Sequence, residues 1–253
     1  MTVALFAPCY VDQLYPEVAI STFRLLEALG LDVVVPTGAV CCGQPMANAG
    51  FGLASSKAEG AFEETFEPYD VIVTPSGSCA VHLNHHVGGA GQRTMELCRF
   101  LHDEIGLERV AALGARWDAR VGVHIGCHAL RGLELATSTE LGPDEAGPPG
   151  TLRHDIVRAL LSTVRQLELV ELTRPDECCG FGGTFAVAEP AVSVKMGTDR
   201  LADHLSNGAE AVVSTDVSCA MHLSGLATRG GQSLPFVHVA EALMRGVGVS
   251  VGT

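Results

Sequence analysis

The sequence contains nine cysteines, and eight of them form two similar sets of four. Cysteine clusters in a reducing compartment bind metal or perform redox chemistry more often than they form structural disulfides. Four soft sulfur ligands suit an iron–sulfur cluster or zinc, and they disfavour calcium and magnesium. The two sets therefore predict two metal–sulfur sites, with these residues as ligands: Cys9, Cys41, Cys42 and Cys79 in the first, and Cys127, Cys178, Cys179 and Cys219 in the second.

The ninth cysteine, Cys98, has no counterpart in the other half of the chain. It stands within MELCRFL, a segment with the apolar spacing of a helix. A single buried cysteine usually behaves as a small apolar side chain. We therefore expect Cys98 to be an inert core residue.

Glycines directly follow both adjacent cysteine pairs. The first pair precedes Gly43, and the second begins the segment CCGFGG. Glycine allows the backbone to approach a bulky inorganic group and to offer N–H groups to its sulfurs. These glycines favour a cluster over cysteines that merely fill a core.

His82 and His222 each lie three residues after the last cysteine of a set, where a CxxC pair would carry its second thiolate. Either histidine could be an additional ligand, or it could donate a hydrogen bond to a sulfur or a carbonyl group. The sequence leaves both readings open. Structural zinc also remains an alternative, although its usual CxxC knuckles are missing from both halves.

The cysteines recur because the order of predicted elements recurs. The apolar runs VALFAP and VGVHIG precede the first cysteine of each set, and LDVVVP and LELVEL precede the pairs. DVIVTPSGS and AVVSTDVS precede the last cysteines, and segments with helical periodicity separate these strands. Alternating strands and helices predict an α/β fold of two pseudo-symmetric repeats, each a parallel sheet flanked by helices. The cysteines would lie at the C-terminal ends of the strands, where such sheets bind ligands.

We place the two repeats at residues 1–117 and 118–253. The segment from Thr137 to Gly150, which ends in Gly-Pro-Pro-Gly, is predicted to form a loop within the second repeat.

The bulk composition excludes several classes of partner. A formal net charge of −13 argues against nucleic acid and anionic lipid surfaces. No run reaches the ~18 apolar residues that a transmembrane helix needs. The beginning of the sequence lacks the basic and apolar pattern of a signal peptide, so we expect a cytoplasmic protein without a transmembrane segment.

In these motifs the chain resembles the cysteine-rich, or CCG-domain, iron–sulfur proteins, whose pattern is a cysteine, a long gap, CCG, another long gap and CxxC. Two copies cover essentially the whole chain. CCGFGG and the endings SGSCAVHL and SCAMHL are most similar to the lactate-utilisation group of that family. The B subunit of heterodisulfide reductase and the iron–sulfur subunit of glycolate oxidase are more distant members.

The resemblance carries the family's ligand positions to the same eight cysteines. It implies iron bound as a cluster, one or two per chain. The chain departs from the family pattern where CxxC becomes CxxH at His82 and His222. That departure makes an ordinary [4Fe-4S] cluster more plausible than the non-cubane clusters of heterodisulfide reductase.

The resemblance further implies an electron-transfer subunit of an oxidoreductase, an L-lactate-oxidising complex or a related 2-hydroxy acid oxidase. Its partners would be the other subunits, including a ferredoxin-type iron–sulfur subunit. No GxGxxG motif indicates a dinucleotide bound by this chain. Two alternatives remain, namely a catalytic subunit similar to heterodisulfide reductase and a zinc-stabilised interaction module.

Overall fold

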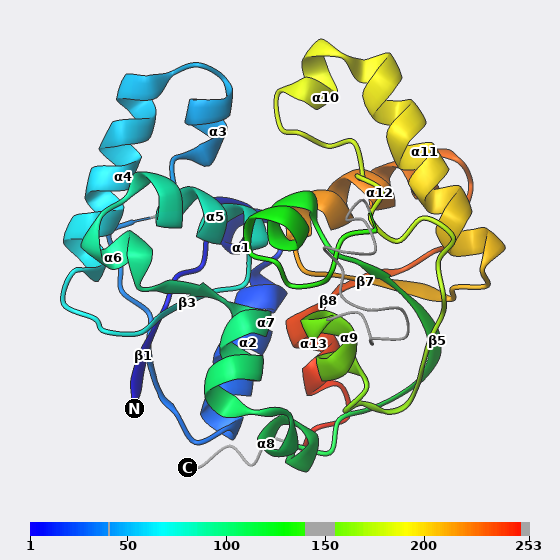
Figure 1. The fold of residues 1–253 in the computed structure, drawn as a ribbon, viewed down its shortest axis with the longest axis horizontal. Helices are drawn as coiled ribbons and strands as arrows, with labels where there is room; N and C mark the ends of the chain where they lie inside the picture. The colour runs from blue at the N-terminus through cyan, green and yellow to red at the C-terminus, as the bar shows by residue number, and fades with distance from the viewer. Residues whose placement is uncertain (40, 140–154, 249–253) are drawn as a thin grey trace.

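The computed structural model describes residues 1–39, 41–139 and 155–248, and it contains two four-stranded parallel sheets (Figure 1). The first sheet has the order β2-β1-β3-β4, and the second has the order β6-β5-β7-β8. The α/β prediction with two similar parallel sheets is confirmed. The strands of the first sheet are β1 (Thr2–Leu5), β2 (Asp32–Val34), β3 (Ile72–Thr74) and β4 (Thr94–Glu96), and those of the second are β5 (Arg116–His124), β6 (Arg165–Leu169), β7 (Ala211–Ser214) and β8 (Phe236–His238).

The two sheets have the same strand order and equivalent registers. Leu5 of β1 pairs with Val73 of β3, and Val123 of β5 pairs with Val213 of β7. Every strand pair is parallel, so each connection must cross over the sheet, and helices make most of these crossovers. As a result, equivalent strands end at equivalent places in the two halves.

The helices lie between the sheets and on their outer faces (Figure 1). The first half contains α1 (Cys9–Leu14), α2 (Pro16–Ala28), α3 (Gln44–Asn48), α4 (Gly52–Phe66), α5 (Gly77–His86), α6 (Gly89–Gln92), α7 (Leu97–Phe100), the π-helix η1 (Leu101–Ile105) and α8 (Leu107–Ala112). The second contains the π-helix η2 (His128–Gly132), α9 (Ile156–Leu161), α10 (Phe185–Ala188), α11 (Pro190–Ser206), α12 (Val217–Arg229) and α13 (Val239–Met244).

One apolar core extends across both halves. Helices α2 and α7 of the first half lie between the sheets together with α9 and α13 of the second (Figure 1). Leu25 of α2, Leu160 of α9 and Leu243 of α13 are almost fully buried in the same cluster of side chains. Burial of apolar surface therefore holds the two sheets together through this shared helical layer.

The last strand of each sheet was not expected. The apolar spacing of RTMELCRFLHDEIG and VHVAEALMRGVG predicts a helix over each segment, whereas β4 and the end of β8 precede the helices α7 and α13 there. These strands have three residues each, which is too short for a readable alternation of apolar and polar side chains. Pairing with the buried neighbouring strands β3 and β7 decides their conformation.

The predicted loop from Thr137 to Gly150 lies mostly outside the described residues. The boundary between residues 117 and 118 falls within β5 and stays a prediction. In the part of the chain that the structure describes, no helix is both long and apolar enough to cross a membrane.

Candidate metal centres

The predicted ligand cysteines lie just beyond the C-terminal ends of the strands. Cys9 is the first residue of α1, which follows β1, and Cys127 directly precedes η2, which follows β5. Cys79 and Cys219 lie in the first turns of α5 and α12, after β3 and β7. Because neighbouring parallel strands end at one edge of a sheet, cysteines that are distant in sequence meet there.

The first set comes together at the edge of the first sheet. The sulfurs of Cys9 and Cys41 are 3.9 Å apart. The Cys42 thiol contacts both Cys41 and Cys79. The structure thus brings all four residues of this set into one group.

The second set has the same arrangement. Cys178 contacts Cys127 and Cys179, and Cys179 in turn contacts Cys219. This chain of contacts matches that of the first set, residue for residue. The convergence is now a structural observation, whereas the assignment of these thiols as ligands stays a prediction.

Backbone conformation and hydrogen bonds at the two pairs are also alike. Gly43 and Gly180 have φ angles of 100° and 85°, which favour glycine. Their N–H groups donate to the sulfurs of Cys41 and Cys178, at 3.5 and 3.4 Å. A Cβ atom on Gly180 would lie 2.6 Å from the carbonyl oxygen of Ser193, so this close approach also requires glycine.

One thiol of each set ionises more readily than the others. Hydrogen bonds from Cys42 and Cys9 lower the pKa of Cys41, and hydrogen bonds from Cys127 and Cys179 lower the pKa of Cys178. The pKa values of Cys9 and Cys127 are raised, first by the hydrogen bonds that they donate to these same partners. In each set these hydrogen bonds therefore favour the thiolate, the form that binds metal, at Cys41 or Cys178 over the other thiols.

The two predicted accessory histidines contact other side chains. His82 Nε2 lies 3.0 Å from Glu59 Oε1, and its ring stacks on His86 with the centroids 4.5 Å apart. His222 Nε2 lies 3.4 Å from the hydroxyl of Ser193. Their role as ligands stays a prediction.

A different histidine lies beside the second set. A ring nitrogen of His124 and the sulfurs of Cys179 and Cys219 all lie within 4.8 Å of one another. The sequence reasoning missed His124, although a histidine within the otherwise apolar strand VGVHIG was a signal. Only the strand register shows that it faces the cysteines.

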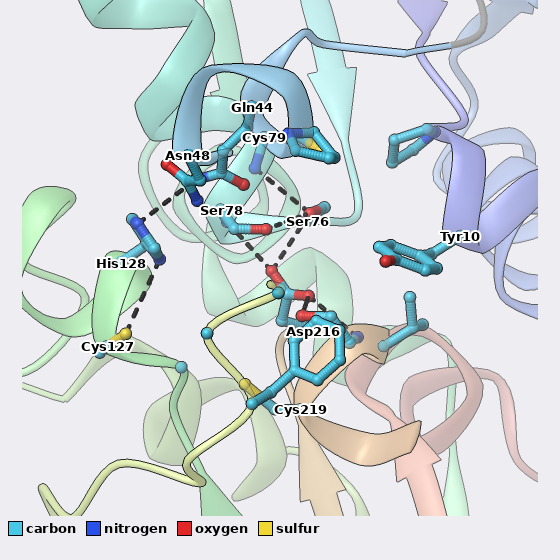
Figure 2. A pocket seen from close by; sticks show the side chains of 18 of the residues that line it. Tyr10, Gln44, Asn48, Ser76, Ser78, Cys79, Cys127, His128, Asp216 and Cys219 are labelled. Carbon is cyan, nitrogen blue, oxygen red and sulfur yellow. Dashed lines mark hydrogen bonds between the residues drawn. The ribbon is translucent and has the colours of Figure 1, made fainter. Parts of the chain in front are cut away.

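Both cysteine sets line one cavity of about 340 Å³ between the halves. Its wall includes Cys9, Cys42 and Cys79 from the first set and all four cysteines of the second. Tyr10 and Phe181 also line it, and their rings meet edge to face with centroids 6.1 Å apart. The two sets therefore face a common space (Figure 2).

Asp216 joins the two halves beside this cavity (Figure 2). Its Oδ2 accepts hydrogen bonds from the Ser78 backbone N–H at 3.0 Å and the Ser76 hydroxyl at 3.2 Å. Its Oδ1 accepts from the backbone N–H of Ser218 at 3.1 Å. One carboxylate therefore caps the N-termini of both α5 and α12.

Cys98 lies apart from both sets. It is fully buried in the shared core, and burial raises the pKa of its thiol well above the usual value. Its position agrees with the expectation of an inert apolar residue.

The same repeat appears in a comparison with protein families. A model described as "Cysteine-rich domain" matches residues 3–84 and again residues 121–224. The chain belongs to the cysteine-rich domain family. Both matched segments include one complete set of four cysteines, so membership covers both of the groups that converge in space.

Several known proteins resemble the chain over nearly its full length. Lactate utilization protein A of Exiguobacterium sp. is 35% identical over 97% of this chain and 98% of that protein. The protein of the same name from Macrococcus caseolyticus is 34% identical over 96% of each chain. Lactate utilization protein A 1 of Bacillus mycoides is 32% identical, again over 96% of each.

Proposed function

We propose that the chain is an iron–sulfur electron-transfer subunit of an L-lactate-oxidising complex. The observation that carries the proposal is the pair of matching four-thiol groups around one cavity. The relatives named lactate utilization protein A indicate the process in which the chain acts.

The residues present fit an iron–sulfur cluster in each half. Four thiols supply soft ligands, and in each set one thiol has a lowered pKa, which favours the thiolate that binds metal. The backbone N–H groups of Gly43, Gly180 and Phe181 donate to cysteine sulfurs and would hydrogen-bond a bound cluster. A bound [4Fe-4S] cluster supplies one-electron transfer, and one or two such clusters per chain would serve this function.

The cavity supports electron transfer better than oxidation of lactate on this chain. Its lining residues, all within the described part of the chain, include no lysine or arginine, whereas Asp216 is among them. Sites that hold a carboxylate usually supply such a cation. We therefore assign the oxidation of lactate to other subunits, with a ferredoxin-type partner exchanging electrons with this chain in the cytoplasm.

A second candidate function is a catalytic subunit similar to heterodisulfide reductase. The shared cavity favours it, because a small molecule between Tyr10 and Phe181 would lie close to both cysteine sets. Release of thiols from a disulfide by the reduced protein, without any partner subunit, would support this alternative over the first.

Metal analysis tests the proposal directly. Protein purified without oxygen should contain iron and acid-labile sulfide, give an EPR signal after reduction, and lack stoichiometric zinc. Zinc without iron or sulfide would contradict the proposal and support a zinc-stabilised module.

Cysteine variants test the ligand assignment. Cys42→Ser and Cys179→Ser should each remove about half of the iron, since a hydroxyl is a poor replacement for a soft thiolate. Cys98→Ser is the matched control, and it should leave the iron content unchanged because Cys98 lies in the core. Equal loss of iron in all three variants would indicate misfolding and contradict the assignment.

A further inference from the structure

The side chains that pack beneath the first cysteine set differ in chemistry from those beneath the second. Three residues before Cys127 stands His124, whereas Phe6 stands three residues before Cys9. The strand register shows that these two positions are equivalent. Phe6 directly follows Leu5, which pairs with Val73 of β3, and His124 directly follows Val123, which pairs with Val213 of β7. A polar side chain therefore replaces an apolar one directly beneath the second set.

Helices α4 and α11 show two more replacements of this kind. They align through Ser55 and Ser193, whose hydroxyls donate to the carbonyl oxygens of Gly43 and Gly180 at 3.1 and 2.7 Å. The seventh residue after the serine is Phe62 in α4 and Arg200 in α11. The eleventh is Phe66 in α4 and His204 in α11. We call Phe6, Phe62 and Phe66 the phenylalanine cluster, and His124, Arg200 and His204 the histidine–arginine cluster.

The phenylalanine cluster gives the first set an apolar base. The ring of Phe6 lies edge to face against Phe62 and Phe66, with centroid distances of 5.0 and 5.5 Å. All three pack in one buried cluster with Cys42 and Cys79. These rings offer no hydrogen-bond donor to a sulfur.

The histidine–arginine cluster is held rigidly in the second half. Arg200 is completely buried, and its Nε donates to His124 Nδ1 at 3.1 Å. Its two terminal nitrogens donate to the carbonyl oxygens of Val123 at 3.1 Å and Arg174 at 2.6 Å. Asp203 lies 3.2 Å from Arg200 and balances its charge, so the main effect on the cysteines comes through His124.

The contact with Arg200 determines which nitrogen of His124 carries the proton. A guanidinium group only donates, so Nδ1 must accept and the neutral ring is protonated on Nε2. Among the described residues, the buried Nε2 has no hydrogen-bond partner. Because the His124 ring lies beside Cys179 and Cys219, this unpartnered N–H is available to donate to the sulfurs of a bound cluster and is unsuited to coordinate a metal.

We propose that the His124 N–H, positioned by Arg200, gives the cluster of the second set a higher reduction potential than that of the first. The inference rests on the clusters proposed above. A reduced cluster carries additional negative charge, which a donor to its sulfurs stabilises and an apolar surrounding does not. One electron then passes favourably from the first cluster to the second, with no bond made or broken.

A carboxylate in the first half also favours a lower reduction potential for the first cluster than for the second. Glu59 packs against Gly43 and lies 3.0 Å from His82. The equivalent residue of α11, the fourth after the aligned serine, is Gly197. Negative charge beside the first set disfavours the added electron there, and the second set has no such carboxylate at this position.

Single-cluster proteins test the order of the potentials. The Cys42→Ser protein retains the second cluster, and the Cys179→Ser protein retains the first. EPR-monitored redox titration should show a higher midpoint potential in Cys42→Ser, by roughly a tenfold factor in the one-electron equilibrium constant, or about 59 mV. Equal potentials or the reverse order would overturn the inference.

His124→Phe, made in the Cys42→Ser background, tests the donor itself. His124→Phe installs the residue of the first half and should lower the midpoint potential at unchanged iron content. His124→Gln keeps an N–H donor, so its midpoint potential should lie between those of His124→Phe and the parent protein. Phe6→Leu in the Cys179→Ser background is the matched control, and it should leave the potential of the first cluster in place. An unchanged potential in His124→Phe would overturn the role of the donor.

The cluster-free protein provides a measurement that does not depend on cluster assembly. Nitrogen NMR of labelled histidine should show His124 protonated on Nε2, and Arg200→Lys should weaken this preference. Protonation on Nδ1 in the wild-type protein would overturn the inference even if His124→Phe fails to hold iron. Absence of iron and sulfide from every preparation would instead contradict the proposed function.

Discussion

The thiols of each set differ in their readiness to react, although they lie in contact. Cys41 and Cys178 each accept hydrogen bonds from two neighbouring thiols and from a glycine N–H. These contacts stabilise the thiolate and lower the pKa of both residues. Both are also partly exposed, so a reagent can reach them in the absence of a cluster.

We expect iodoacetamide to modify Cys41 and Cys178 first when the cluster-free protein is treated under reducing conditions. Because their pKa values are lowered, their reaction should persist as the pH falls from 8 to 6, where ordinary thiols become protonated and slow. Peptide mass spectrometry at short reaction times would measure this order. Cys98 is the internal control, since burial raises its pKa, and its rapid modification would contradict the structure.

At the level of the elements, a single carboxylate caps the N-termini of two helices from different halves. Asp216 accepts hydrogen bonds from the first turns of α5 and α12, which otherwise leave N–H groups without partners. The cap therefore stabilises each helix and also fixes the position of one half against the other beside the cavity (Figure 2).

Asp216→Ala should lower the free energy of unfolding by about 2 kcal/mol, at ~1 kcal/mol for each helix cap lost. Urea denaturation of the cluster-free protein would measure the change. Ser76→Ala is the comparison, because Ser76 accepts from the Cys79 N–H and so caps α5 alone, while both backbone N–H donors of Asp216 stay in place; it should cost about half as much. A smaller loss in Asp216→Ala than in Ser76→Ala would contradict the double cap.

The cap of helix α13 makes stability depend on pH. His238 accepts a hydrogen bond from the Ala240 N–H at 3.2 Å, and burial lowers its pKa from 6.5 to about 4. Below pH 6.5 the unfolded chain binds a proton that the folded chain excludes. The contribution of the neutral histidine is therefore fully present above that pH and is lost as the pH falls towards 4.

His238→Asn should retain the cap and remove this titration. Asparagine is a favourable N-cap residue, so stability at pH 7 should change little. Between pH 7 and pH 5 the variant should lose about 2 kcal/mol less than the wild-type protein, at ~1.4 kcal/mol per pH unit below pH 6.5. Urea titrations at both pH values would measure it, and parallel losses in the two proteins would contradict the assignment.

At the scale of the whole molecule, the two repeats share a core and should unfold together. Leu243 of α13 and Cys98 of α7 belong to different halves but to one buried cluster. The cysteine sets lie beyond the C-terminal ends of the strands. The helical layer lies between the sheets (Figure 1). Loss of packing in this layer therefore weakens both halves at once.

Leu243→Ala should destabilise the protein by about 2–5 kcal/mol, as for other large-to-small substitutions in cores. Alkylation of Cys98 in increasing urea would report the unfolding of the first half, although the substitution lies in the second. The midpoint should fall by the same amount as that measured by circular dichroism. Val187→Ala, at a side chain that is 82% exposed, should leave both midpoints unchanged.

The sequence by itself determined the repeat, the parallel α/β class and the two sets of cysteines. Apolar runs before Cys9 and Cys127, and matching segments before Cys79 and Cys219, carry local signals that depend on neighbouring residues alone. These signals also predicted that the sets would lie beyond the strand ends. The local signals were too weak to predict β4 and β8. These strands have three residues each, which adopt strand conformation because they pair with β3 and β7.

Only the tertiary structure decided how the two repeats differ and how they join. Phe62 and Arg200 are both internal residues of helices, and nothing local shows that they lie beneath equivalent cysteines. Asp216 likewise reads as an ordinary helix cap until the fold brings α5 to its other oxygen. Such contacts join residues that are far apart in the chain, so they depend on the packing of whole elements.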